Sequence, residues 1–523
     1  MQNRWSLLWA AGVGSAWLGF APEASAITAE QRFEKLERHI LELERRLEAS
    51  EAENQKLRSK KPASTSTASE PDVKALDQKV KILERKLEVE HEVTEANAKK
   101  TPRVEAGSAG FRITSPDGDH QLRLRGYVQA DGNIFMDDSS GDAIADKFTI
   151  RRARLNFDGT LFKYADFRIA PDFGGGQSRL FDAYLDLHYL PFASLNVGKQ
   201  KAPISLERLQ SATALTFAER AYPTQLAPNR DVGVLLHGEF AKPGYTTQYG
   251  GPHNFNDFIT YQLGVFNGAR DNGFIDTDLN DDFEFQGRVF AHPFQHSGIG
   301  PLEGLGLGVA GSWGHPRNET SIPGLTSPGQ QRILRYSEAN STATATSVNG
   351  YHYRVYPQLY WYWGPFGLLS EYAISSQELR RSTITGPTIN AKTRQDNTAW
   401  QVALSYVLTG EDSSFNGVKP RHAFNPFNGQ WGAWQVAGRW SELDVDDDTF
   451  RDFDPRATST LFFANPAQSV SKATSWALGL NWYLNNNVKV MADYEQTHFD
   501  GGAAGNGDRP TEKIFFTRFQ FSY

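Results

Sequence analysis

The sequence predicts an all-β transmembrane barrel of about sixteen antiparallel strands, preceded by a short α-helical coiled coil. Aromatic residues are abundant, with 34 Phe, 19 Tyr and 12 Trp, although the mean hydropathy is only −0.51. Apolar and polar residues alternate along many segments after Gln121, and aromatic residues alternate up to Tyr523. Strands of a membrane barrel expose only alternate residues to lipid, so they need no long apolar run. The low hydropathy excludes a bundle of membrane helices.

The first 26 residues are predicted to be a signal peptide. Arg4 supplies positive charge, residues 5–20 are apolar, and Ala24, Ser25 and Ala26 form a small-residue cleavage site. The alternative is an uncleaved anchor helix, which the short apolar run disfavours. No later segment is apolar and long enough for a transmembrane helix. We therefore expect an exported chain.

Residues 27–94 are predicted to form a periplasmic coiled coil. Apolar residues recur at spacings of three and four in two stretches, first at Phe33, Leu36, Ile40, Leu43 and Leu47, then at Val73, Leu76, Val80, Leu83 and Leu87. A Ser/Thr/Pro/Lys-rich break at 59–71 separates them, and residues 95–110 are expected to be a linker. Each stretch is too short to be stable without a partner, so other copies of the chain should pair with it. The alternative is a pair of solvated, half-formed helices, and the number of helices in the coil stays open, as does contact with peptidoglycan.

Residues 111–523 are predicted to form the barrel, because the periodicity changes there to two. One unit places Ala153, Leu155 and Phe157 on one face and Arg152, Arg154 and Asn156 on the other. The sixteen expected strands lie near 121–131, 147–159, 164–173, 180–190, 194–200, 230–241, 258–267, 282–292, 304–314, 351–362, 366–376, 397–409, 430–443, 473–484, 487–498 and 511–523.

Other features favour a membrane barrel over a soluble β-sandwich, which also alternates. Tryptophan is frequent near strand ends, as in the aromatic belts that contact lipid headgroups. Short turns alternate with long polar loops such as 314–350 and 444–472. The last strand ends on Tyr523, which resembles the signal that the barrel-assembly machinery binds. Two turns, 242–257 and 410–429, are long for the periplasmic side, so either the strand count slips there or they fold into the lumen.

The polar face of the strands should line an aqueous lumen. It carries many arginines, and a ring of arginine or lysine in a pore selects for anions. Acidic residues such as Asp131 and Asp158 share the same strands, so the arginines could instead be paired in the wall, giving a nonselective or weakly cation-selective pore. The inward arginines on the expected strands are Arg123, Arg125, Arg152, Arg154, Arg168, Arg288, Arg354, Arg439 and Arg518.

The longest irregular stretch between strands, residues 201–230, needs a reason inside a compact domain. Its apolar residues, including Leu206, Leu209 and Phe217, would let it pack against the barrel interior and narrow the pore. A loop on the surface or at a subunit contact is the alternative. If it folds inward, the basic and polar residues in and beside it become candidate anion contacts: Lys199, Lys201, Ser205, Arg208, Arg220 and Arg230.

Several other functions lack support in the sequence. The twelve histidines are scattered, no hydrolase or zinc-protease motif is present, and there is no cysteine. We therefore expect no enzyme activity, no cofactor and no metal, although a hydrolase assembled from distant loops is an alternative. The formal charge of −7 disfavours a nucleic-acid partner. An adhesin or envelope tether anchored by a barrel is a further alternative, but sixteen strands favour an open path.

Nine segments, taken in order, resemble the phosphate-selective porin O and P family: RRARLNFDG (151–159), FRIAPDFGGG (167–176), DAYLDLHYLP (182–191), VGKQKAPISLERLQS (197–211), LTFAERA (215–221), RDVGVLLHG (230–238), FNGARD (266–271), YVLTGED (406–412) and LGLNWYLNNNVKVMADYE (478–495). The resemblance implies a homotrimeric, sixteen-stranded anion porin in the outer-membrane lipid of a Gram-negative bacterium, passing phosphate or polyphosphate by passive diffusion. It also implies an inward loop and an arginine-lined path. The matching segments assign Arg152, Arg154, Lys199, Lys201 and Ser205 to that path.

Overall fold

The computed structural model describes residues 45, 70–98, 100–107, 110–136, 145–247, 250–253, 256–274, 276, 282–386, 388–454 and 460–523. The chain divides into two compact units, Met1–Glu92 and Val93–Tyr523. The predicted signal peptide and the first heptad stretch lie outside the described residues, apart from residue 45. The second heptad stretch lies on helix α2 (Glu70–Ala98), where Val80, Leu83 and Leu87 are exposed. No helix among the described residues is both long enough and apolar enough to cross a bilayer.

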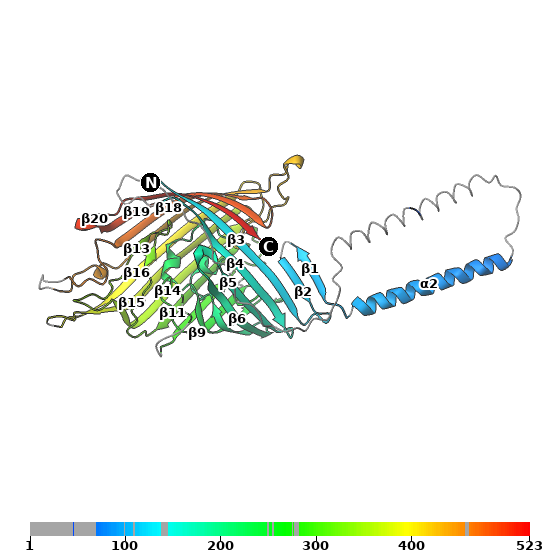
Figure 1. The fold of residues 1–523 in the computed structure, drawn as a ribbon, viewed down its shortest axis with the longest axis horizontal. Helices are drawn as coiled ribbons and strands as arrows, with labels where there is room; N and C mark the ends of the chain where they lie inside the picture. The colour runs from blue at the N-terminus through cyan, green and yellow to red at the C-terminus, as the bar shows by residue number, and fades with distance from the viewer. Residues whose placement is uncertain are drawn as a thin grey trace, which may run out of the picture. The chain divides into compact units, whose positions relative to one another are not determined.

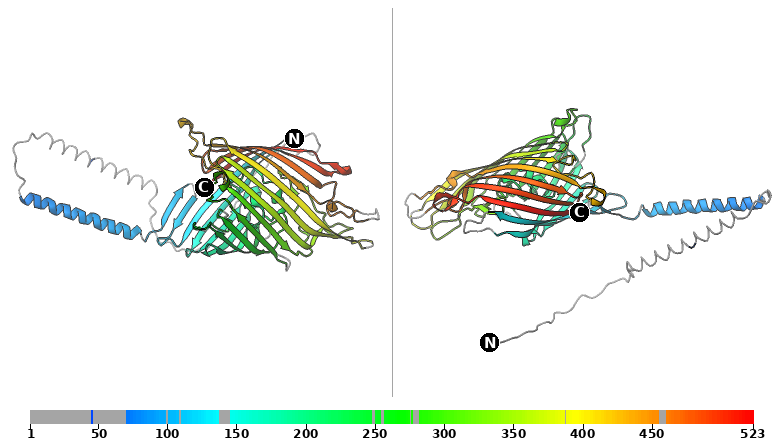
Figure 2. Two further views of the ribbon diagram at one scale, coloured as in Figure 1. Left: turned by 180° about the vertical axis from the view of Figure 1, so that it is seen from behind. Right: turned by 90° about the horizontal axis from the view of Figure 1, so that it is seen from above.

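Sixteen strands among the described residues form a closed antiparallel barrel (Figure 1). Each strand pairs with the next along the chain, and the last pairs with the first from Lys513 opposite Met136 to Ser522 opposite Tyr127. The strands run diagonally around the wall in both views of Figure 2. They are β3 (Gln121–Met136), β4 (Lys147–Leu161), β5 (Ala165–Asp172), β6 (Arg179–Leu190), β7 (Ala193–Gln200), β8 (Asp231–Phe240), β9 (Ile259–Phe266), β10 (Glu284–Ala291), β11 (Leu305–Gly314), β14 (Ser347–Trp363), β15 (Phe366–Ser382), β16 (Asn390–Val407), β17 (Ala433–Asp444), β18 (Val470–Tyr483), β19 (Val488–Ala503) and β21 (Glu512–Ser522).

The predicted strand count and barrel are confirmed, because each expected strand overlaps one of these sixteen. The two long turns do not reflect a slipped count: β8 ends at Phe240 and β9 begins at Ile259, while β16 ends at Val407 and β17 begins at Ala433. The predicted linker, 95–110, requires correction. It holds the end of α2 and strand β1 (Arg103–Gly107), which forms a hairpin with β2 (Gly110–Thr114). The hairpin forms because β3 extends beyond β21 and leaves an edge from Gln121 to Leu124, to which β2 adds as a strand.

The strand faces are inverted relative to a soluble protein. On β21, Phe519 and Phe521 are exposed, whereas the alternating Arg518 and Gln520 are buried. The exposed face includes aromatic pairs such as Trp434 and Trp482, whose ring centroids are 5.0 Å apart. Apolar side chains on the outside suit lipid, and polar side chains on the inside face the lumen.

The stretch between β7 and β8, residues 201–230, lies inside the barrel and is called the inward loop below. It contains helix α3 (Leu206–Leu209) and the 3-10 helix η2 (Tyr222–Leu226). Lumen-facing side chains of distant strands bind its backbone: Gln129 donates to the Ala212 carbonyl at 2.9 Å and Lys489 to the Leu215 carbonyl at 2.8 Å. Glu371 of β15, farther around the barrel, accepts a bond from Leu206 N at 2.8 Å, so the loop is held across the lumen.

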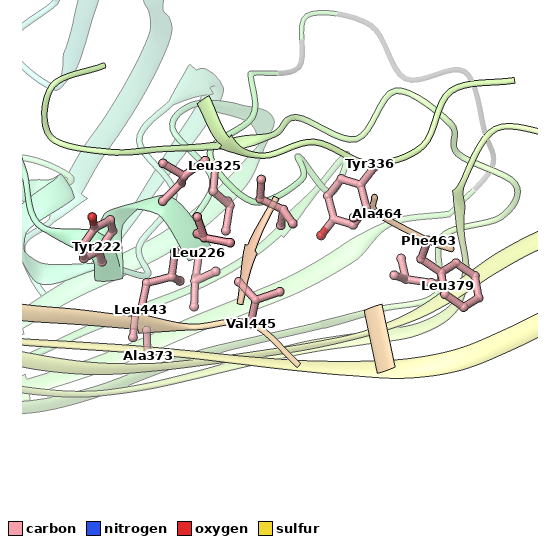
Figure 3. Packing of buried hydrophobic residues seen from close by; sticks show 14 of the residues in the cluster. Tyr222, Leu226, Leu325, Tyr336, Ala373, Leu379, Leu443, Val445, Phe463 and Ala464 are labelled. Atoms are coloured by element: carbon pink, nitrogen blue, oxygen red, sulfur yellow. The ribbon is translucent and has the colours of Figure 1, made fainter. Parts of the chain in front are cut away.

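An apolar core fills one side of the lumen. Figure 3 shows Tyr222 and Leu226 of the inward loop beside Leu443 of β17, with Leu325 of an external loop packed against them. The external loops 315–346 and 445–469 were predicted to be polar, but they also carry buried apolar residues that pack in this core. These are Leu325, Ile333, Leu334, Tyr336, Ala343, Val445, Leu461, Phe463 and Ala464.

The shorter elements of the barrel unit are β12 (Leu325–Thr326), β13 (Arg332–Leu334), β20 (Gly507–Asp508), α4 (Gly300–Glu303), η1 (Gly174–Gly176), η3 (Pro426–Asn428), η4 (Asp447–Thr449) and η5 (Ala504–Asn506).

Candidate functional site

Two cavities lie beside the inward loop, on the side of the lumen formed by β3 to β7. The outer cavity has a volume of about 790 Å³ and extends to residues of the external loop 315–346, including Pro323 and Gln330. The inner cavity has a volume of about 420 Å³ and extends to the end of β21 at Ser522 and Tyr523. Both cavities are lined by Arg154, Lys201, Ala212 and Arg230. These four residues therefore mark where the two cavities meet.

Positive charge predominates in both cavities. Among the described residues, nine lysines and arginines but only three carboxylates line the outer cavity. Five lysines and arginines and one side-chain carboxylate line the inner cavity. The outer set is Arg151, Arg152, Arg154, Arg179, Lys199, Lys201, Arg208, Arg220 and Arg230 against Asp172, Glu219 and Asp276; the inner set is Arg125, Arg154, Arg168, Lys201 and Arg230 against Asp182.

Three arginines on the barrel wall beside the cavities bind carboxylates of the wall. Arg154 lies 2.7 Å from Asp172, and its guanidinium lies over the Phe181 ring at 3.8 Å from the centroid. Arg168 binds Asp158 at 2.5 Å, and Arg125 donates to the same carboxylate at 2.7 Å from Nε. Such pairing holds each guanidinium in one orientation along the cavities and cancels part of its charge.

Three cations on the inward loop lack such carboxylate partners. Lys201 Nζ donates to the carbonyls of Leu209 at 2.7 Å and Gln210 at 3.2 Å. Arg220 donates to the carbonyls of Glu207 at 3.1 Å and Gln210 at 3.0 Å.

Arg208, the third, donates to the Thr224 carbonyl and the Asn272 side chain. Among the described residues, no carboxylate lies within 4.0 Å of these three cationic groups. Burial and the positive charges of Arg230 and Arg220 lower the pKa of Lys201 well below that of an ordinary lysine. A dissolved anion in the cavity would offset this repulsion.

Arg230 and Lys199, at the two ends of the inward loop, are both paired. Arg230 Nε lies 2.5 Å from Asp182 on β6, and Lys199 Nζ forms an ion pair with Asp276. Gly198, just before Lys199, has φ +132°, and a Cβ there would lie 2.3 Å from the Ala183 carbonyl oxygen. A glycine is therefore required at this strand end.

Five predicted site residues contribute to neither cavity. Ser205 caps α3 and donates to Glu371 at 3.1 Å, and Arg288 donates to Gln358 at 2.9 Å. Arg439 and Arg518 donate to the Glu219 and Ala218 carbonyls at 2.8 and 2.5 Å and so hold the inward loop against the wall. The fifth, Arg123, lies opposite Arg112 of β2 at the end of β3, away from both cavities. Arg354 is also buried away from them, bound to Asp271 and Glu284.

Arg151 lines the outer cavity although strict alternation places it on the lipid face. The β3–β4 register shifts here, since Gln129 pairs with Arg152 but Ala130 with Ile150, and this bulge leaves Arg151 unpaired in the ladder. Arg151 and Arg152 both approach Glu219 of the inward loop, at 2.6 and 3.8 Å. Against the effect of burial, the two arginines hold the pKa of Glu219 well below its usual value.

Arg179, His253 and Asn272 also line the cavities and were not predicted from the sequence. Arg179 begins β6, where alternation is not yet established, and its guanidinium lies 5.2 Å from the Phe274 ring centroid. His253 and Asn272 lie in connections between strands, for which periodicity gives no orientation. The unusual length of the turn that contains His253 was the one available signal.

Comparison with known proteins agrees with this architecture. A family model described as phosphate-selective porin O and P matches residues 122–523. Porin O of Pseudomonas aeruginosa is 25% identical over 458 residues, which cover 79% of this chain and 91% of that protein. Among solved structures, the outer membrane channel DcaP of Acinetobacter baumannii aligns with a TM-score of 0.46 and 11% identity, over 80% of this chain and 99% of that one. The anion-selective porin from Comamonas acidovorans aligns with a TM-score of 0.43 and 12% identity, over 77% of this chain and 100% of that one. Because the family model spans most of the barrel, this chain belongs to the phosphate-selective porin O and P family and is an outer-membrane porin.

Proposed function

We propose that the protein passes small anions, phosphate or polyphosphate above all, by passive diffusion through the outer and inner cavities. The observation that carries this proposal is the excess of lysine and arginine over carboxylate in both cavities. A cavity lined by one sign of charge concentrates ions of the opposite sign, and its low-dielectric walls strengthen the effect. Membership of the porin O and P family supports the choice of phosphate.

The anion would first meet Arg151, Arg152 and Arg179 in the outer cavity, then pass between Arg154, Lys201 and Arg230. Guanidinium groups offer paired N–H donors that match two phosphate oxygens. Passage requires each contact to be favourable but weak enough to release the ion to the next one. Bonds that already occupy part of each guanidinium, such as Arg154 to Asp172, weaken the contact with the anion in this way.

The competing proposal is a nonselective or weakly cation-selective pore, which requires the carboxylates to neutralise the path. Ion pairs neutralise Arg518 with Asp131 and Arg439 with Glu495 away from the cavities. They also cancel part of the charge of cavity-lining arginines such as Arg154, which pairs with Asp172. Where the cavities meet, the partners of Lys201 among the described residues are two backbone carbonyls. The balance of positive and negative charge where the cavities meet thus favours anions.

We further propose that the protein works as a homotrimer, with residues 27–94 forming a periplasmic coiled coil between its copies. The exposed apolar residues of α2, Val80, Leu83 and Leu87, support this assignment because they would be covered by a neighbouring copy. Among the structural neighbours, OmpT of Vibrio cholerae is described in a trimer form. Deleting residues 27–94 should weaken the oligomer on native gels and leave single-channel conductance unchanged; an unaltered oligomer would contradict this role for the helix.

The test of anion selectivity is the reversal potential of the purified protein in a planar bilayer under a gradient of potassium chloride. The sign should be that of an anion-selective pore, and added phosphate should reduce the chloride conductance. A potential of cation sign would overturn the anion proposal while leaving the porin architecture intact. An anion sign without phosphate block would restrict the proposal to anions in general.

A further inference from the structure

The long turn between β8 and β9 brings a histidine to the inner cavity. His253 and Asn256, on this turn, line the cavity together with Lys201 of the inward loop. Periplasmic turns of membrane barrels are short, so this one needs a reason for its length. Its position beside the cation-lined path suggests that the reason lies in the path itself.

Among the residues that the structure describes, none forms a hydrogen bond with the imidazole of His253, at either ring nitrogen. Polar groups in such a position normally bind another part of the protein, water or a ligand. Both ring nitrogens are buried in the orientation that the structure shows, so the ring must turn one of them toward the cavity before an acceptor from solution can satisfy it.

Among the described residues, the charged groups around His253 are five cations from four elements and one side-chain carboxylate from a fifth. They are Lys201 and Arg230 of the inward loop, Arg168 of β5 and Asp182 of β6, with Arg125 of β3 and Arg154 of β4 in the same cavity. Burial and the charge of Lys201, followed by that of Arg230, lower the pKa of His253 well below its ordinary value. In the empty cavity the imidazole is therefore neutral at physiological pH.

We propose that the inner cavity is a second anion-binding site, in which His253 donates a hydrogen bond to the bound anion and takes up a proton when it binds. The proposal rests on the function proposed above. An anion in the cavity offsets the repulsion that the cations exert on a charged imidazole, so binding and protonation favour each other. No covalent bond other than one N–H bond changes: the anion enters with its charge unchanged, and one proton from solution binds to the unprotonated ring nitrogen.

Sulfate is a suitable probe because its charge stays constant over the pH range in which histidine titrates, whereas phosphate itself changes charge there. The measurement is the sulfate concentration that half-blocks chloride conductance in planar bilayers. We expect this concentration to fall roughly fivefold from about pH 8 to about pH 5.5, as one positive charge is added to the site. His253→Gln keeps a polar side chain but cannot take up the proton, so its block should stay at the high-pH value throughout.

A matched control is His498→Gln, because His498 is exposed on β19 and lies outside both cavities. It should behave as the wild type. A pH dependence that survives in His253→Gln would overturn the proposal and assign the titration to another group such as Lys201. Sulfate block without any pH dependence in the wild type would also overturn it, and would leave the anion channel standing. A cation-signed reversal potential in the wild type would instead overturn the proposed function itself.

Discussion

Lys201 is the residue whose charge should matter most for selectivity, because it lines both cavities at the point where they meet. Its ammonium group donates to two carbonyls, and no carboxylate of the described residues lies within 4.0 Å of it to form an ion pair. A unit charge acts on an anion about 6 Å away in water with about 0.7 kcal/mol. The same charge acts on a cation with the opposite sign, so Lys201→Gln, which removes one unit, should lower the anion-to-cation permeability ratio about tenfold. Lys201→Glu changes two units and should lower the ratio about a hundredfold.

The assay is the reversal potential in a planar bilayer under a chloride gradient at about pH 6, because a low pH favours the charged form of a lysine whose pKa is lowered. Lys147→Glu is the control: the residue is exposed at the outer end of β4 and lines neither cavity. It should alter the ratio far less than Lys201→Glu. If Gln and Glu at position 201 gave the wild-type ratio, the path would not pass this residue. If the control matched Lys201→Glu, the effect would come from overall charge rather than from a local contact.

Three further outcomes follow from the structure. Lys201 loses its charge as the pH rises through its lowered pKa. The permeability ratios of the wild type and Lys201→Gln should therefore converge at a pH below the pKa of an ordinary lysine. Ratios that stay apart at high pH would contradict the lowered pKa. Arg518→Ala leaves Asp131 buried without its partner and should cost about 3–5 kcal/mol of folding stability. Circular dichroism should show this loss as a lower melting temperature. An unchanged melting temperature would contradict a stabilising role for the ion pair. Gly198→Ala should reduce the yield of folded barrel, because a Cβ at φ +132° would clash with the facing carbonyl. Gly438→Ala should not, because a Cβ there would make only ordinary van der Waals contact with Leu478 at 3.8 Å; equal yields would argue against the strained strand end.

The strands could be predicted because a membrane barrel imposes one rule on every residue that it exposes. Alternation fixes which side chains face lipid, and a charged side chain on that face is costly, so the register follows from the sequence alone. The rule fails at Arg151, where one extra residue in β4 turns the side chain inward without any local marker. It is also silent on His253, since a turn has no periodicity to read.

The sequence did not show which arginines form ion pairs with carboxylates. Two arginines at equivalent positions of neighbouring strands differ in role only through the partner that folding brings to them, and that partner is distant in sequence. Arg518 meets Asp131 across the seam where the barrel closes, and its charge serves to hold the wall and the inward loop.

Lys201 instead meets the backbone of its own loop. Carbonyl oxygens hold an ammonium group in place but carry only partial charge, so they cancel less of it than a carboxylate does. A loop that positions cations by its backbone therefore presents more net charge to the path than a wall that positions them by carboxylates. Anion preference in this barrel accordingly depends on the inward loop more than on the arginines of the strands, and substitutions at Lys201, Arg208 and Arg220 should shift selectivity more than equivalent substitutions at the paired Arg168 or Arg154.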